Sequence, residues 1–311
     1  MSPVGPRGAL RRCGAPARPA VFRFPLSAFR FSPSVFVLTA SRFGVGLVCQ
    51  HAQTYTMKAL FYYAALFVMS TSVLLAGEDT RLYEMRTYYA APGKLDDLHA
   101  RFRDHTCKLF EKHGMMNIGY WVPVENPDNQ LIYILSYSSR EARESSWKAF
   151  MADPDWKAAQ RASEANGRLV TKVESRFMNA TDYSPAIKPG SGAAPRTFEL
   201  RTYTASAGNL DALNARFRDQ TLKLFSKHGM ENFGYWNLTK DQPGADKTLV
   251  YLLAHRSKEA AAASFQAFRA DPDWVAAREA SEKKAGGSLT EGGQAGVKSV
   301  FLKPTDYSQT K

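Results

Sequence analysis

The chain has 311 residues and a formal net charge of +12 at neutral pH, which suits two domains of ordinary size with an N-terminal extension. The charge is concentrated in that extension, because residues 1–76 contain eight Lys or Arg residues and no Asp or Glu. The remainder is mildly basic with mixed signs and has no basic stripe, so composition excludes the usual electrostatic basis for a nucleic-acid partner.

The N-terminal extension contains two segments. Residues 57–76 carry a basic residue, an apolar run and a small residue at Ala76, the pattern of a secretory signal peptide. The apolar run is short for a membrane span, which needs about 20 residues. Met57 would then be the true start and residues 1–56 a superfluous leader, and the exported protein would keep no integral membrane segment. The alternative is a mitochondrial transit peptide, because the leader bears Arg and Ser and no acids.

The rest of the chain contains one module twice, at residues 80–184 and 196–308, joined by a linker at 185–195 that is rich in Pro, Gly, Ala and Ser. A residue kept in both copies meets a demand common to both. The recurring motifs are Glu84-x-Arg86-Thr87-Tyr88 with Glu199-x-Arg201-Thr202-Tyr203, Lys112-His113-Gly114-Met115 with Lys227-His228-Gly229-Met230, Gly119-Tyr120-Trp121 with Gly234-Tyr235-Trp236, Asp153-Pro154-Asp155-Trp156 with Asp271-Pro272-Asp273-Trp274, and Thr-Asp-Tyr-Ser from Thr181 and from Thr305.

Each copy predicts the element order β-α-β-β-α-β. In the first copy, residues 82–89 alternate in polarity, which indicates a strand. Apolar residues at helical spacing from Leu95 predict a helix up to His113, where Gly114 provides the stop. The remaining elements are strands over 116–124 and 130–138, a helix from Ser139 that breaks at Asp153-Pro154 in N-cap and N1 style, and a strand over 169–178.

This order is the ferredoxin-like plan, an α+β fold with antiparallel sheets. A four-stranded sheet with helices on one face leaves its other face uncovered, and two copies on one chain can cover each other. We therefore expect one intramolecular pseudo-two-fold barrel, as a monomer with an internal pseudo-dimer or as a homo-oligomer. We expect Tyr83 and Met85, with their copies, to pack under the helices. Glu84, Arg86 and Tyr88 would then face the space between the two sheets.

As a set, these motifs resemble the NIPSNAP family. The resemblance rests on Tyr-Glu-Met-Arg-Thr-Tyr opening a strand, Lys-His-Gly-Met ending a helix, Gly-Tyr-Trp in a strand and Asp-Pro-Asp-Trp at a helix break, and it covers both copies. It implies the dimeric α/β-barrel fold, in which two ferredoxin-like units join their sheets. That wider group includes monooxygenases and haem-handling enzymes. Eukaryotic family members are largely mitochondrial, and the signal-like segment at Met57 departs from that pattern.

The first candidate site residues lie on one face of the first strand. Glu84 and Arg86 could bind an anionic or hydroxylated ligand through the forked guanidinium, although a structural ion pair between the repeats is the favoured alternative. Tyr88 could donate its hydroxyl to a ligand or fill the barrel. The same interpretations apply to the copies of these residues, Glu199, Arg201 and Tyr203.

The other shared candidates have structural alternatives that we favour. His113 could act as a general base or haem ligand, but a position at a helix C-terminus before Gly suits capping. Trp121, which follows Gly and Tyr120, could form the wall of a pocket or pack in the core. Their copies are His228, Tyr235 and Trp236.

Four further residues are expected to have structural rather than functional roles. Cys107 corresponds to an apolar residue in the second copy, which indicates a buried helix position rather than a nucleophile. His105 has no histidine counterpart, so a surface helix position is expected. Arg101 and Arg103 are predicted to form a solvated helix face, paired in part with Asp104.

Three hypotheses about function follow. The first is a small-ligand-binding or scaffold protein that uses the space between the sheets, without catalysis and without a cofactor. The second is a monooxygenase-like or haem-handling enzyme, which rests on fold analogy alone. The third is a module that docks another protein. The sequence has no metal-ligand spacing, phosphate loop, nucleotide fingerprint or Ser/His/Asp set.

Overall fold

The computed structural model describes residues 79–187, 190 and 196–311. The predicted leader and signal peptide lie outside the described residues, as does most of the predicted linker. The elements of the first repeat are β1 (Leu82–Ala90), α2 (Leu95–Arg101), η1 (Phe102–Thr106), α3 (Cys107–Lys112), β2 (Met116–Pro123), β3 (Gln130–Tyr137), α4 (Arg140–Ala152), α5 (Pro154–Ser163) and β4 (Val170–Ala180). Those of the second are β5 (Thr197–Thr204), α6 (Leu210–Arg216), η2 (Phe217–Thr221), α7 (Leu222–Lys227), β6 (Glu231–Leu238), β7 (Thr248–His255), α8 (Lys258–Ala270), α9 (Pro272–Ala285), η3 (Gly293–Gly296) and β8 (Val297–Pro304).

The strands form one closed antiparallel barrel in the order β1-β3-β2-β8-β5-β7-β6-β4. Each repeat contributes four consecutive strands of this order, in the ferredoxin-like arrangement. Two pairings between the repeats, β2 with β8 and β4 with β6, close the barrel. This confirms the predicted intramolecular barrel, and closure leaves no unpaired sheet edge.

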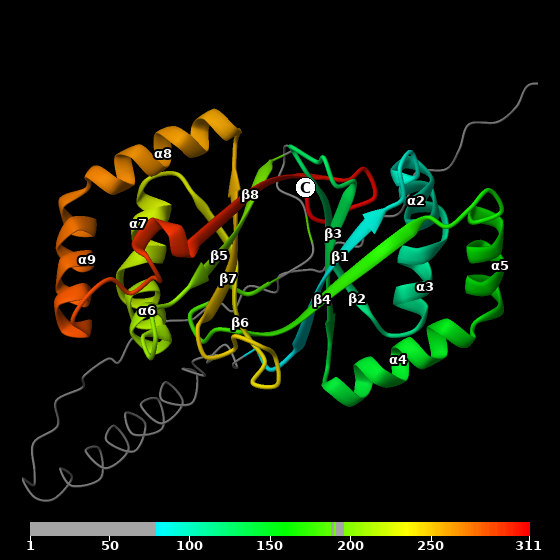
Figure 1. The fold of residues 1–311 in the computed structure, drawn as a ribbon, viewed down its shortest axis with the longest axis horizontal. Helices are drawn as coiled ribbons and strands as arrows, with labels where there is room; N and C mark the ends of the chain where they lie inside the picture. The colour runs from blue at the N-terminus through cyan, green and yellow to red at the C-terminus, as the bar shows by residue number, and fades with distance from the viewer. Residues whose placement is uncertain (1–78, 188–189, 191–195) are drawn as a thin grey trace, which may run out of the picture. The chain divides into compact units, whose positions relative to one another are not determined.

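Helices cover the outer faces of the strands, α2 to α5 over the first repeat and α6 to α9 over the second (Figure 1). The caps of α4 and α5 are those that the sequence predicted. The Ser139 hydroxyl accepts a hydrogen bond from the Ala142 N–H at 3.1 Å, and the Asp153 carboxylate accepts one from the Asp155 N–H at 2.8 Å. Pro154 then occupies the first turn of α5, where its missing N–H costs nothing.

The barrel interior is apolar and packed, and it is built by both repeats. Tyr83 and Met85 of β1 meet Phe198 of β5 there, together with the two tryptophans Trp121 and Trp236. The sequence-based assignment of strand faces was therefore wrong. A period-two pattern shows which side chains share a face, but it does not show which face the helices cover. Here the polar face of β1 lies under the helices, where α4 supplies partners for its charges.

The recurring Gly-Tyr-Trp motif has a packing explanation. A Cβ atom built on Gly119 would overlap the indole of Trp121, and one on Gly234 would lie 2.6 Å from Cη2 of Trp236. The register of β2 against β3 also shifts between Asn117 and Gly119, as at a β-bulge. The glycine thus gives room for the indole two residues later to fold back across the strand.

We expect Gly119→Ala to lower the free energy of unfolding by about 1–3 kcal/mol, the usual cost of overpacking a core. Urea unfolding followed by circular dichroism measures the change. Gly287→Ala is the matched control, because a Cβ there meets no atom within 4 Å. Equal effects of the two substitutions would contradict the packing explanation.

The two Thr-Asp-Tyr-Ser tails cross over to the opposite repeat. Tyr307, at the end of the second repeat, has its hydroxyl 2.9 Å from Nδ1 of His99 in α2, and the Ser308 hydroxyl accepts the Tyr120 N–H at 3.0 Å. The first tail does the same in reverse, since the Tyr183 hydroxyl donates to Oδ1 of Asn214 in α6 at 2.8 Å. The tail motif is therefore a reciprocal clasp between the repeats.

A tail residue, rather than the predicted neighbour, is the ion-pair partner of Arg103. Arg103 pairs with Asp306 of the opposite tail at 2.5 Å rather than with its neighbour Asp104, and Arg218 pairs with Asp182 at 2.7 Å. Both pairs are exposed, so water screens them and each contributes little to stability.

Candidate functional site

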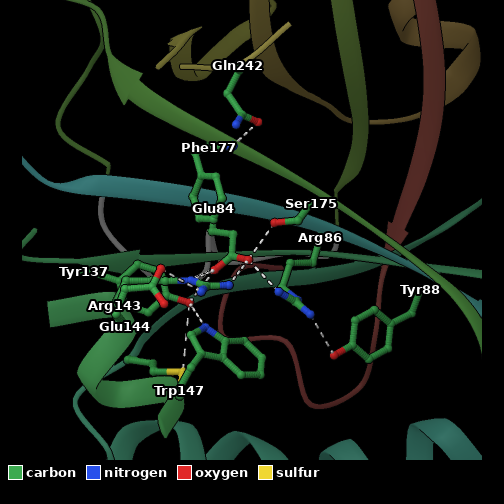
Figure 2. A network of polar contacts seen from close by, with 11 residues as sticks. Glu84, Arg86, Tyr88, Tyr137, Arg143, Glu144, Trp147, Ser175, Phe177 and Gln242 are labelled. Atoms are coloured by element: carbon green, nitrogen blue, oxygen red, sulfur yellow. Dashed lines mark hydrogen bonds and ion pairs between the residues drawn. The ribbon is translucent and has the colours of Figure 1, made fainter. Parts of the chain in front are cut away.

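Glu84, in the middle of β1, is a fully buried carboxylate surrounded by donors (Figure 2). It accepts hydrogen bonds from Nη1 of Arg86 at 2.5 Å, from the Tyr137 hydroxyl at 2.9 Å and from the Ser175 hydroxyl at 2.6 Å. Arg143 of α4 binds both carboxylate oxygens, through Nε at 3.1 Å and Nη2 at 3.0 Å. The carboxylate is thus held by side chains from β3, β4 and α4 as well as from its own strand, β1.

The electrostatics of this cluster favour ionised Glu84. Burial alone would raise the pKa of Glu84, but the hydrogen bonds from Arg143 and the charge of Arg86 outweigh it and lower the pKa to about 2. Two guanidinium groups share this one buried carboxylate, and Arg143 is paired in addition with the exposed carboxylate of Glu144 at 3.1 Å. The Arg86 guanidinium lies 4.4 Å from the ring centre of Trp147 in a cation–π contact.

The second repeat builds a reduced version of the cluster around Glu199. Arg201 and Ser299 each donate to it at 2.5 Å, and Nε2 of His255 lies 3.1 Å away. The helix over it has Ala261 where α4 has Arg143. A single guanidinium therefore faces the second carboxylate, and no excess cation remains there.

A second difference between the repeats concerns Nε of Arg86 and of its copy, Arg201. In the second repeat, Nε of Arg201 donates to the Tyr251 hydroxyl at 2.8 Å. In the first, Nε of Arg86 and the Tyr133 hydroxyl are both buried and, within the described part of the chain, neither has a hydrogen-bond partner. A buried N–H that lacks an acceptor costs free energy unless a ligand or water supplies one.

Arg86 lines a cavity of about 540 Å³ between the sheet and the helices of the first repeat. Its lining has four cationic side chains and one acidic one, Glu164. The cationic residues are Arg86, Arg101, Arg168 and Lys172, and the walls include Tyr88, Phe102, Trp147 and Trp156.

Arg101 is buried against this cavity, contrary to the predicted solvated face. Its Nη1 pairs with Glu164 of the α5 end at 3.0 Å, and its guanidinium lies 5.3 Å from the ring centre of Trp156. Nε of Arg101 and Nε1 of Trp156 are buried with no acceptor among the described residues. The cavity thus collects several N–H donors that the protein leaves unused.

A π-helical turn follows Arg101 directly. Phe102–Thr106 forms η1, and the Thr106 hydroxyl donates to the Arg101 carbonyl at 3.1 Å. Such turns are rare and are frequent at functional sites. Helical periodicity assumes a uniform 3.6-residue turn, so this change of direction, and with it the burial of Arg101, was missed.

Other sequence candidates lie away from the cavity. His113 and His228 follow α3 and α7, and their Nε2 atoms lie 2.7 Å and 2.6 Å from the carboxylates of Asp153 and Asp271, which cap the next helices. Each histidine thus connects the end of one helix to the start of another, a contact that the predicted capping of its own helix did not include. Tyr120, Trp121 and their copies lie in the packed cores.

Burial raises the pKa of Cys107 to about 12, which disfavours a thiolate. Within residues 79–311, leaving out the uncertain linker positions, no three His, Cys, Asp or Glu side chains gather as metal ligands would. None of the described helices is long and apolar enough to cross a membrane.

Comparison with known families identifies the chain. The NIPSNAP family model matches residues 83–185 and 198–309, one match for each repeat. The chain belongs to the NIPSNAP family. Each matched segment begins near the start of β1 or β5 and ends just after a Thr-Asp-Tyr-Ser tail. No curated protein matches the chain significantly.

Solved NIPSNAP structures are similar to a single repeat. An uncharacterised NIPSNAP-like domain protein from Burkholderia xenovorans is 20% identical and covers 36% of this chain and 94% of its own, with a TM-score of 0.32. A NIPSNAP family protein of unknown function from Agrobacterium tumefaciens is 24% identical over 34% of this chain and 94% of its own, with a TM-score of 0.31. A putative monooxygenase from Lactobacillus acidophilus is 10% identical and covers 72% of this chain and 94% of its own, with a TM-score of 0.46.

Proposed function

We propose that this NIPSNAP protein binds a small anionic ligand in the cavity of its first repeat. The observation that carries the proposal is Arg101, a buried guanidinium whose Nε has no acceptor among the described residues and which lines a cavity of about 540 Å³. That volume is typical of small-ligand sites. Nε of Arg86 is a second such donor on the same cavity.

The cavity lies under the helices rather than between the two sheets, where the sequence suggested a ligand. Tyr83, Trp121, Phe198 and Trp236 occupy the space between the sheets. Arg86 and Tyr88, which the sequence suggested as ligand-binding residues, line this cavity. Arginine suits an anion because its N–H groups match carboxylate or phosphate oxygens.

Binding rather than catalysis is the function that these side chains support. A general base needs a pKa near the working pH, and the pKa of Glu84 is lowered to about 2. The imidazoles of His113 and His228 are engaged by Asp153 and Asp271 through Nε2, so neither offers this atom to haem without losing its aspartate contact.

The test uses Arg101→Gln, which keeps a polar side chain, although a shorter one, and removes the positive charge. We expect native mass spectrometry of the wild-type protein from its own host to show a retained small molecule. Loss of a charged hydrogen bond costs about 1.5–3 kcal/mol, so the variant should bind that molecule about 10- to 100-fold more weakly.

The chain supplies its own control for this experiment. Arg216 is the copy of Arg101 in the second repeat, where its Nε also has no acceptor among the described residues and where it lines a separate cavity of about 950 Å³. Because Arg216 does not line the cavity of the first repeat, Arg216→Gln should retain the molecule that binds there. Equal loss in both variants, or equal retention in both, would overturn the proposal.

A further inference from the structure

Two exposed apolar side chains stand at the rim of the same cavity. Met151 is 50% exposed and Val173 is 44% exposed, and both line the cavity. They are two of only four large hydrophobic residues that are strongly exposed in the described part of the chain. In the second repeat, Arg269 takes the position of Met151. Exposed apolar groups beside a cavity are typical of a binding site for an apolar ligand surface.

The buried cations of the cavity lie deeper than this rim. The side chain of Arg101 is 4% exposed and that of Arg86 is 12% exposed. The aromatic walls of Trp147 and Phe150 line the same space. A ligand that reaches the two guanidinium groups therefore passes apolar surface on its way to solvent.

The charge balance indicates how much negative charge the ligand carries. Arg101 is neutralised by Glu164, whereas Arg86 shares the buried Glu84 with Arg143. Arg143 is also paired with Glu144 at 3.1 Å, but that carboxylate is 62% exposed and water screens its charge, so the buried groups keep part of one positive charge. Two positive groups at the mouth contribute less. Lys172 is paired with Glu174 at 2.6 Å, and Arg168 is exposed to water, which screens its charge. The buried end of the cavity therefore balances a monoanion better than a dianion.

We infer that the ligand is an amphiphilic carboxylate, a single carboxylate head with an alkyl chain. Its two oxygens accept from Nε of Arg86 and Nε of Arg101, the two guanidinium donors of this cavity that have no acceptor among the described residues. Its chain lies along Trp147 and emerges between Met151 and Val173. This inference rests on the proposed function and adds the chemical class of the ligand.

The experiment titrates the full chain with butyrate, hexanoate, octanoate and 1-octanol by calorimetry. Each buried CH₂ contributes about 0.8 kcal/mol, so we expect the dissociation constant to fall by up to about fourfold per methylene. Octanol lacks the charge and should bind at least about tenfold more weakly than octanoate.

Met151→Ser tests the rim, with Met116→Ser as the matched control. Met116 is 45% exposed and is not part of the cavity. We expect Met151→Ser to weaken octanoate binding about three- to tenfold and to leave butyrate unchanged, because butyrate is too short to reach the rim. Met116→Ser should change neither.

The outcomes separate this inference from the proposed function. Equal affinity for butyrate and octanoate would overturn the amphiphile and leave anion binding intact. The inference also fails if no alkanoate binds while the wild type retains another molecule that Arg101→Gln loses. If no alkanoate binds and no molecule is retained, both proposals are wrong.

Discussion

Trp121→Ala is expected to lower the free energy of unfolding by about 3–5 kcal/mol, the usual cost of truncating a large aromatic side chain in a core. Trp121 is fully buried in the barrel interior, where its ring centre lies 5.6 Å from that of Phe198 and 6.4 Å from that of Phe233. Both partners belong to the second repeat, so the substitution weakens the contact between the repeats. Urea unfolding monitored by circular dichroism gives the value.

The same variant separates a core role from a ligand-binding role for Trp121. Because Trp121 does not line the cavity of the first repeat, the folded fraction of Trp121→Ala should bind ligand with wild-type affinity. Met116→Ala, at an exposed position, should change stability by no more than about 0.5 kcal/mol. A stability loss below about 1 kcal/mol for Trp121→Ala would show that the interior is less tightly packed than described.

Glu84→Gln is expected to lower the free energy of unfolding by about 3 kcal/mol at pH 7, and this difference should depend on pH. The pKa of Glu84 is lowered from 4.5 to about 2 in the folded protein. A carboxylate with a lowered folded pKa contributes stability that is fully present above its unfolded pKa. The contribution is lost as the pH falls from about 4.5 through the folded pKa of about 2, and it is gone only below that value, where both states are protonated.

Urea unfolding of both proteins at pH 7, 4.5 and 2.5 measures this difference. The free energies of unfolding of the two proteins should differ by about 3 kcal/mol at pH 7 and by much less at pH 2.5. Glu199→Gln should lose stability with the same direction of pH dependence, because the hydrogen bond from His255 and the charge of Arg201 outweigh burial and lower the pKa of Glu199. A difference for Glu84→Gln that stays constant down to pH 2.5 would contradict the assigned ionisation.

Glu84 also connects stability with the proposed site. It holds Arg86 through one carboxylate oxygen, and the guanidinium then lies over Trp147 at the cavity wall. Arg143 also pairs with Glu84, so the negative charge of Glu84 is shared and neutralises the positive charge of Arg86 only in part. The copy in the second repeat lacks that contact, because Ala261 replaces the arginine.

The repeat, the order of elements and the barrel were all predictable from the sequence. Two copies of one motif set specify one fold twice, and a sheet with one uncovered face needs a partner. Local signals also sufficed for the helix starts at Ser139 and Asp153, because a cap depends on neighbours within three residues. The aspartates that bond His113 and His228, in contrast, lie on other helices and were not predicted.

The site itself was decided by tertiary structure. Glu84 and Arg86 were predicted to face the space between the sheets but lie under the helices, because strand periodicity is the same for either face. Arg101 was misjudged because its burial depends on Glu164 and Trp156, which α5 brings against α2 from 55 or more positions along the chain. A sequence specifies which residues share a face or a cap through short-range geometry, whereas a cavity exists only where distant elements pack incompletely against one another.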